Sequence, residues 1–252
     1  MSLRGVIFDM GGTLLHYRPP GGGWDDMEKL GAAGVYGVLR DLGHTLPPEV
    51  DALNTAWDFM LDIWRNLDGH AMQDLKLHRI LTRLAAHWGV NGLTTEQVDN
   101  LALAYTTAIQ AGVRPLDGAE DTLRALRERG LRVGLISNTH WPGEIHQRDL
   151  DRHSLTPHLE YQVFSADVEA WKPHAEIFHL ALDALELQPE EAAYVGDSLY
   201  FDVWGAQQAG IRGVWIEQPR RFLPEGFDEV TPDATLPTLP DLIAHVDRWR
   251  SA

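Results

Sequence analysis

The chain has 252 residues, of which 44% are hydrophobic and 9% aromatic, so it can bury a sizeable core. Its formal net charge of −16 argues against a nucleic-acid or anionic-membrane surface, because both reward clustered Lys and Arg. It contains no cysteine, which excludes disulfides and a thiol nucleophile. No apolar run reaches the roughly 18 residues of a membrane span. We therefore expect a cytoplasmic protein.

The first predicted strand is Leu3–Phe8, and the next lies more than a hundred residues later. Four amphipathic helical patterns fill the interval. Their apolar stripes are Met27, Leu30, Val35, Val38, Leu39 and Leu42; Val50, Leu53, Trp57, Leu61 and Trp64; Leu77, Ile80, Leu81, Leu84 and Trp88; and Val98, Leu101, Ala102, Tyr105 and Ile109. Thr94 and Gln97 have the spacing of a capping box for the fourth helix. We therefore predict an inserted helical cap domain, residues 19–115, on a two-stranded hinge.

Strands and helices alternate in the rest of the chain. The further predicted strands are Leu131–Ser137, Tyr161–Phe164, Ala192–Val195 and Ile211–Ile216, all near-continuous apolar runs. Helices are predicted at Gly118–Gly130, at Lys172–Leu187 with Pro173 in the first turn, and at Pro240–Trp249. Residues 1–18 and 116–252 thus predict an α/β core domain with a doubly wound parallel sheet. His140, His146 and His153 fall in a polar connection and are expected to be solvated.

Polar residues of complementary kinds follow the ends of the predicted strands. Asp9 follows the first strand, Ser137 and Asn138 end the second, and Asp197 follows the fourth, with Asp202 five residues further on. Lys172 stands alone before a proline and is one of only three lysines in the chain, with Lys29 and Lys76. Because doubly wound sheets place their sites at the carboxyl ends of the strands, we expect these residues to meet in one site.

Phosphoryl transfer accounts for this set of residues. A carboxylate such as Asp9 can attack phosphorus and hold it as an aspartyl-phosphate. Asp9 and Asp197 are hard oxygen ligands suited to Mg²⁺. Lys172, the Ser137 hydroxyl and backbone N–H groups of the glycine turn would neutralise the phosphoryl oxygens, and Gly11 and Gly12 would allow a close approach of the backbone.

The segments "FDMGGTL", "LISN", "WKP" and "GDSLYFD" resemble the four sequence motifs of the haloacid dehalogenase superfamily. The resemblance runs from Leu3 to about Ile216, and the helical insert resembles that family's C1-type cap. It implies an aspartyl nucleophile at Asp9 and a phosphoryl-binding set of Gly12, Ser137, the Asn138 backbone and Lys172. It also implies Mg²⁺ held by Asp9, the Gly11 carbonyl oxygen and Asp197, with Thr13 and Asp202 as supporting residues; Asp202 would support Lys172 or a metal-bound water.

The chain departs from the family pattern at Gly11. Phosphatases of the family usually carry a second aspartate there, which acts as general acid and then as base. A positioned acid–base group is worth on the order of 10²–10⁴ in rate. Substrates whose leaving group needs little protonation, such as aryl or acyl phosphates, would therefore be favoured, or another group would donate the proton. His16 and Tyr17, just past the turn, are the nearest candidates.

Three functions are compatible with this pattern. The favoured prediction is a Mg²⁺-dependent phosphatase acting on a small phosphorylated metabolite. A 2-haloacid dehalogenase is the second possibility, because it also uses an aspartyl ester. That branch, however, usually has an aromatic residue at the Gly11 position and needs no magnesium-binding carboxylate such as Asp197. A phosphonatase would need a lysine in the cap at a position that neither Lys29 nor Lys76 matches. The third alternative is a catalytically weak binding or regulatory protein. The sequence does not indicate an oligomeric state.

Overall fold

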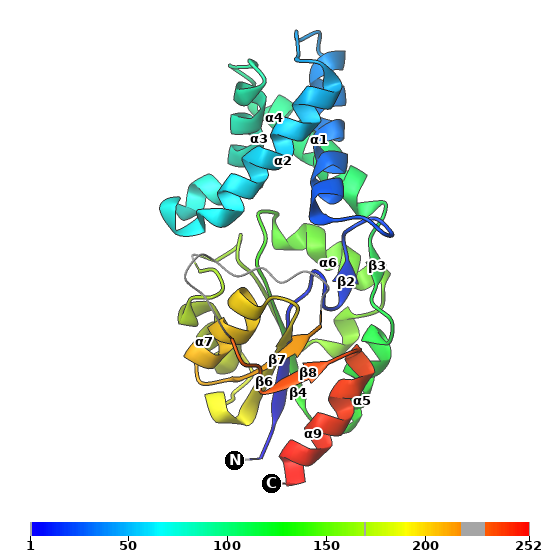
Figure 1. Cartoon of the computed structure of the whole chain (residues 1–252), viewed down its shortest axis with the longest axis vertical. Coiled ribbons are helices and arrows are strands. Elements are labelled where there is room, and N and C mark those ends of the chain that lie inside the picture. The colour runs from blue at the N-terminus through cyan, green and yellow to red at the C-terminus, as the bar shows by residue number, and fades with distance from the viewer. Residues whose placement is uncertain (1, 169, 218–229, 252) are drawn as a thin grey trace. The chain divides into compact units, whose positions relative to one another are not determined.

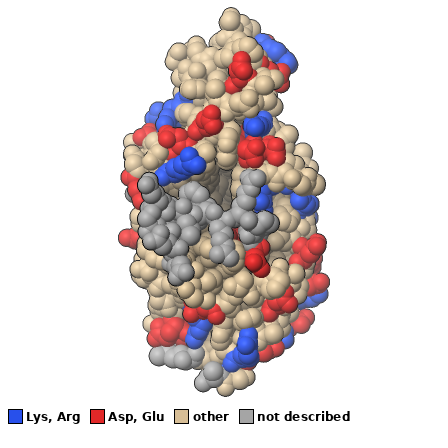
Figure 2. Space-filling model, in the orientation of Figure 1, with Lys and Arg blue, Asp and Glu red and all other residues tan. Residues whose placement is uncertain are grey.

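The computed structural model describes residues 2–168, 170–217 and 230–251 (Figure 1). Its chain divides into two compact units, one formed by Met1–His16 with Arg114–Ala252 and the other by Tyr17–Val113. No described helix is both long enough and apolar enough to cross a membrane. On the face shown in Figure 2, acidic and basic side chains are interspersed.

The first unit is built on a sheet of six parallel strands in the order β5-β4-β1-β6-β7-β8. The strands are β1 Gly5–Phe8, β4 Arg132–Ser137, β5 Tyr161–Phe164, β6 Ala192–Gly196, β7 Arg212–Ile216 and β8 Ala234–Leu236. From β1 the chain proceeds outward on one side through β4 and β5, and on the other through β6, β7 and β8. The predicted α/β class with a doubly wound parallel sheet is confirmed, whereas the short edge strand β8 was not predicted.

Side chains of the central strands alternate between two buried faces, as the twofold periodicity of a strand requires. On one face Ile7, Ile136 and Tyr194 join a core cluster that includes Ile177 and Phe178 of helix α7. Neighbouring residues on the strands point to the other face and are buried too, as Val6 and Leu135 are. Because both faces are covered, the strands read in sequence as continuous apolar runs.

The helices of this unit are α5 Ala119–Glu128, α6 Gly143–Arg152, α7 Ala175–Ala184, α8 Gly205–Gln208 and α9 Leu242–Ser251. Helix α6 was predicted as a polar connection, and it is indeed polar apart from a few buried positions. The predicted place of Pro173 is wrong: α7 begins after an N-cap at His174, so Pro173 precedes the helix. A π-helical turn, Leu199–Trp204, follows the end of β6.

The two crossings between the units are paired in a small antiparallel sheet. Strand β2, Leu15–His16, pairs with β3, Arg114–Pro115, so that His16 lies opposite Arg114. The second unit consists of α1 Trp24–Asp41, α2 Glu49–Arg65, α3 Leu77–His87 and α4 Thr95–Gln110, with short 3₁₀ turns between α2 and α3. The capping box of α4 forms as predicted, with Thr94 and Gln97 each accepting from the other's backbone N–H.

The predicted buried face of α2 is wrong. The buried side chains of this helix are Ala52, Ala56, Met60 and Ile63. Its bulkier apolar residues lie on a neighbouring face: Val50 is 72% exposed, and Leu53, Trp57, Leu61 and Trp64 are half-buried. Small side chains let packed helices approach closely, so the core takes the alanine face rather than the more hydrophobic one.

A buried carboxyl group lies inside the helical unit. Glu28 of α1 is 4% exposed, and the hydroxyl of Tyr105 on α4 donates a hydrogen bond to it. A Cβ atom on Gly31, one turn further along α1, would lie 2.4 Å from the Tyr105 ring, so the glycine makes room for that ring. Burial raises the pKa of Glu28 to about 7, although hydrogen bonds from Tyr105 and Trp64 oppose the shift.

Candidate active site

The register of the central strands brings three polar segments to one edge of the sheet. Phe8 of β1 pairs with Leu135 of β4 on one side and with Val195 of β6 on the other. The residues that follow therefore emerge together, and the Asp9 N–H donates to the Val195 carbonyl at 2.9 Å. This edge is the carboxyl end of the strands, at the point where the chain switches direction across the sheet, which is where α/β folds bind ligands.

Three carboxylates meet at this edge. Asp9, Asp197 and Asp202 each offer an oxygen atom, and these atoms lie within 4.8 Å of one another. Asp9 and Asp202 are buried and Asp197 is half-buried. Like charges this close are unfavourable without a compensating cation. The structure thus gathers the three predicted aspartates into one cluster.

The turn after β1 is closed by backbone hydrogen bonds and by Gly12. The Met10 carbonyl accepts from the N–H groups of Leu14 at 2.8 Å and Leu15 at 2.9 Å, and the Gly12 N–H donates to the Leu15 carbonyl at 2.8 Å. Gly12 has a left-handed φ of 91°, and a Cβ atom added to it would lie 2.3 Å from Asp197 Oδ2. A side chain here would therefore be strained and would displace Asp197.

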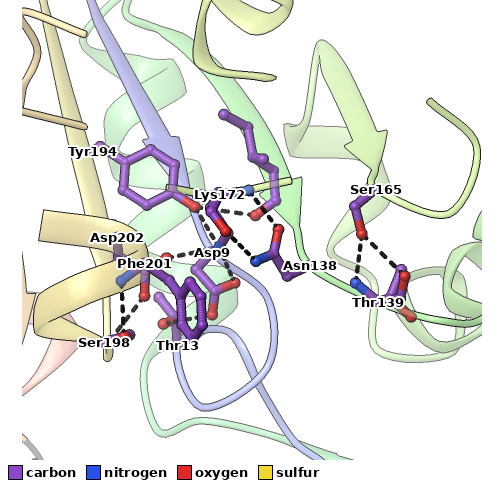
Figure 3. A network of polar contacts seen from close by, with 11 residues as sticks. Asp9, Thr13, Asn138, Thr139, Ser165, Lys172, Tyr194, Ser198, Phe201 and Asp202 are labelled. Atoms are coloured by element: carbon purple, nitrogen blue, oxygen red, sulfur yellow. Dashed lines mark hydrogen bonds and ion pairs between the residues drawn. The ribbon is translucent and has the colours of Figure 1, made fainter. Parts of the chain in front are cut away.

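Lys172 supplies the positive charge. Its side chain is 2% exposed, and its ammonium group donates to Asp9 Oδ1 at 2.7 Å, to Asp202 Oδ1 at 2.7 Å and to the Tyr194 hydroxyl at 2.8 Å (Figure 3). Burial opposes this charge, but Asp202 and Asp9 outweigh it and raise the pKa of Lys172 above its usual range. Lys172 is therefore an ammonium ion held between two carboxylates.

Asp9 is held at both of its oxygens. Oδ1 accepts from Lys172, and Oδ2 accepts from the Thr13 hydroxyl at 3.2 Å. Burial raises the pKa of Asp9 to about 6, with the charge of Asp202 adding to the effect and Lys172 opposing it. A second cation at the cluster would favour the ionised carboxylate.

Asp202 is fixed as firmly as Asp9. Its Oδ1 accepts from Lys172, and its Oδ2 accepts from the Ser198 N–H at 2.9 Å. The hydroxyl of Ser198 in turn accepts from the Phe201 N–H at 3.1 Å and begins the π-helical turn that carries Asp202. The peptide carbonyl of Asp197 accepts from the Trp215 indole at 3.0 Å, which ties this loop to β7.

The side chain of Asn138 joins two loops, a role that the sequence did not indicate. Its Nδ2 donates to the Lys172 carbonyl and its Oδ1 accepts from the Lys172 N–H, both at 2.9 Å. Ser137, one residue earlier, is 3% exposed at the end of β4. The pair of bonds thus fixes the backbone at Lys172 relative to the strand that delivers Ser137.

The expectation of solvated histidines is wrong for two of the three. His140 and His146 are buried at 3% and 4% exposure, and His153 is half-buried. His146 stacks on Trp141 and shares a 2.6 Å hydrogen bond with the Thr139 hydroxyl. Burial lowers the pKa of His146 to about 3, so the ring is neutral. His146 is buried between the rings of Trp141 and Phe164, and His140 lies against the ring of Trp171.

Two predicted candidates for the proton donor lie beside the small sheet. His16 is half-buried in β2, and Tyr17, which is 5% exposed, is the first residue of the helical unit. The position of neither residue shows that it donates a proton to the leaving group, so proton transfer by His16 or Tyr17 stays a prediction. At Gly11 itself no side chain is present to supply a proton.

Comparison with known proteins decides the family. A family model described as "Hydrolase: haloacid dehalogenase-like hydrolase" matches residues 3–210, which include every strand end of the site. The chain belongs to the haloacid dehalogenase-like hydrolases. It is therefore an enzyme, and its six-stranded parallel sheet is the sheet of that family.

Two relatives of this family align over most of the chain. Haloacid dehalogenase-like hydrolase domain-containing protein 3 of Bos taurus is 33% identical, with 98% of this chain and 95% of the relative covered. Glyceraldehyde 3-phosphate phosphatase of Pyrococcus furiosus is 27% identical over 217 residues, which are 85% of this chain and 81% of the relative. The solved structure of the HAD-hydrolase YfnB from Bacillus subtilis, described as bound to magnesium, has the same fold, with a TM-score of 0.68 at 20% identity and coverage of 98% and 100%.

Proposed function

We propose that the protein is a Mg²⁺-dependent phosphatase that hydrolyses a small phosphorylated metabolite through an aspartyl-phosphate on Asp9. The observation that carries this proposal is the Asp9 carboxylate, buried between Lys172 and Thr13 and within a cluster with Asp197 and Asp202. The name of the relative from Pyrococcus furiosus, a phosphatase of a small phosphorylated sugar, supports the same class of reaction.

In the first step an Asp9 oxygen forms a bond to phosphorus while the bond to the leaving oxygen breaks. Water then attacks the same phosphorus, which releases inorganic phosphate and returns the Asp9 carboxylate. Lys172 and the Ser137 hydroxyl are proposed to bind the phosphoryl oxygens. Since the three N–H groups of Lys172 already have protein acceptors, contact with a phosphoryl group requires one of these bonds to be shared.

The donor set fits Mg²⁺. Among the described residues, the carboxylates of Asp9, Asp197 and Asp202 cluster beside the ammonium group of Lys172, so that hard oxygen ligands outnumber the positive charge there. We propose that Asp9, Asp197 and the Gly11 carbonyl oxygen would hold the ion, with Asp202 supporting it. When bound, Mg²⁺ would supply electrostatic stabilisation of the phosphoryl oxygens.

The missing carboxylate at Gly11 restricts the leaving group in this proposal. An alkoxide leaving group needs a proton as it departs, whereas an aryl oxide or a carboxylate does not. Hydrolysis of aryl and acyl phosphates would therefore depend less on the absent acid than hydrolysis of alkyl phosphates. The helical unit Tyr17–Val113 is proposed to act as the cap that selects the substrate.

A panel of phosphorylated metabolites together with p-nitrophenyl phosphate tests the proposal, assayed with Mg²⁺ and with EDTA. We expect phosphate release that EDTA abolishes and that added Mg²⁺ restores. Chloride release from a 2-haloacid without metal would instead identify a dehalogenase. Activity in neither assay would contradict the enzyme mechanism and favour a binding protein.

A further inference from the structure

The Tyr194 hydroxyl is the third acceptor of the Lys172 ammonium group. An ammonium has three N–H donors, and here two are used by Asp9 and Asp202 and the third by Tyr194, at 2.7, 2.7 and 2.8 Å. Two of the acceptors are charged and belong to the recognised motifs, whereas Tyr194 is a neutral phenol in the middle of β6. In sequence it reads only as one more core residue of an apolar strand.

The position of this hydroxyl is determined by the core. Tyr194 is fully buried, and its ring meets that of Phe178 edge to face, with centroids 5.1 Å apart. Its hydroxyl donates to the Ile136 carbonyl at 3.1 Å. Ile136 directly precedes Ser137, so one hydroxyl connects the lysine to the strand that delivers Ser137. Its proton is directed at Ile136 and its oxygen accepts from Lys172, while the hydroxyl also lies against Asp202 (Figure 3).

We propose that Tyr194 is a positioning residue of the reaction, which holds Lys172 Nζ on Asp9 Oδ1. This inference rests on the proposed phosphatase function. Without the hydroxyl, only the two carboxylates would hold the ammonium group, and one of its donors would be unsatisfied in a buried site. The ammonium would then sample positions in which Asp9 is no longer correctly oriented for attack on phosphorus.

The test is Tyr194→Phe, which keeps the ring and its contact with Phe178 and removes only the hydroxyl. Tyr36→Phe is the matched control, because the Tyr36 hydroxyl also donates to a backbone carbonyl, that of Pro47 at 2.9 Å, but in the helical unit. We expect kcat to fall about 10-fold in Tyr194→Phe while KM changes less than about 2-fold, as for the loss of one hydrogen bond to a charged group. Tyr36→Phe should keep the wild-type kcat.

A second readout does not depend on turnover. The chain has only three lysines, so the ¹⁵N resonance of the Lys172 ammonium can be assigned with Lys29→Arg and Lys76→Arg variants. A buried ammonium with three acceptors exchanges slowly with solvent, and we expect its signal to shift and broaden in Tyr194→Phe but not in Tyr36→Phe.

The outcomes separate the two proposals. A wild-type kcat in Tyr194→Phe overturns the positioning role, whatever the Lys172 signal does. An unchanged Lys172 signal overturns it as well, even where kcat falls, because the loss would then come from elsewhere. If the wild-type protein hydrolyses no substrate, the proposed phosphatase function fails, and the Lys172 signal alone decides whether Tyr194 positions the ammonium group.

Discussion

Glu28 should make the stability of the helical unit depend on pH. Its pKa is about 7 in the folded protein, against 4.5 for an ordinary glutamate. The folded state therefore holds the proton over a pH range in which the unfolded state has lost it. The stabilising effect of the buried neutral carboxyl is complete below pH 4.5 and is lost as the pH rises through about 7.

The size of this pH dependence follows from the pKa of Glu28 in the folded protein and that of an ordinary glutamate. Folding raises the pKa of Glu28 from 4.5 to about 7, and each unit of pKa corresponds to about 1.4 kcal/mol. The free energy of unfolding should therefore be about 3 kcal/mol lower under alkaline than under acidic conditions. Glu28→Gln removes the ionisation and keeps an oxygen that can accept from Tyr105. The free energy of unfolding of Glu28→Gln minus that of the wild type should therefore increase by about 3 kcal/mol from pH 4.5 to pH 8.5.

Urea unfolding of both proteins from pH 4.5 to 8.5 measures this difference. Hydrogen exchange of the α1 and α4 amides measures the stability of the helical unit separately from the rest of the chain. Glu49→Gln is the control, because Glu49 is an exposed carboxylate at the start of α2. Its difference from the wild type should vary much less with pH. A difference between wild type and Glu28→Gln that is flat from pH 4.5 to 8.5 would refute the reasoning.

Three further predictions concern the site. Asp9→Asn should lower kcat on the order of 10³-fold or more, measured by phosphate release; an active variant would exclude Asp9 as the nucleophile. Gly11→Asp should raise kcat on alkyl phosphates by about 10-fold or more and on aryl phosphates less, since Gly11 does not share the left-handed φ of Gly12; equal gains would mean that another group already donates the proton. Gly12→Ala should lower the free energy of unfolding by about 1–3 kcal/mol, because φ at this position is 91°, and should weaken Mg²⁺ binding by displacing Asp197. A wild-type affinity for Mg²⁺, measured by isothermal titration calorimetry, would contradict this.

Much of the fold could be predicted because the central strands are mostly apolar and a polar residue ends or directly follows β1, β4 and β6. That rule places Asp9, Ser137 and Asp197 at one edge before any coordinates are known. It does not identify Tyr194, whose ring satisfies the apolar pattern of β6 while its hydroxyl serves the site. The side-chain role of Asn138 is equally hidden, because it depends on a partner loop 34 residues away.

Two of the errors arise because burial depends on the neighbouring side chains as well as on hydrophobicity. In α2 the alanines are buried and the larger Trp57 and Leu61 are left half-exposed. In α6 the buried His146 lies under an aromatic neighbour that a polar sequence does not reveal. Strand β8 has only three residues, too few for a periodic pattern.

The amide of Asn138 reproduces with one side chain the pair of hydrogen bonds that a neighbouring strand would offer to Lys172. The backbone at Lys172 is therefore tied directly to the end of β4, although the two segments carry different motifs. Substitutions at Asn138 and at Lys172 should therefore have non-additive effects on the reaction. The second and third motifs are thus joined through one side chain, so that a substitution at Asn138 should also change the position of Lys172.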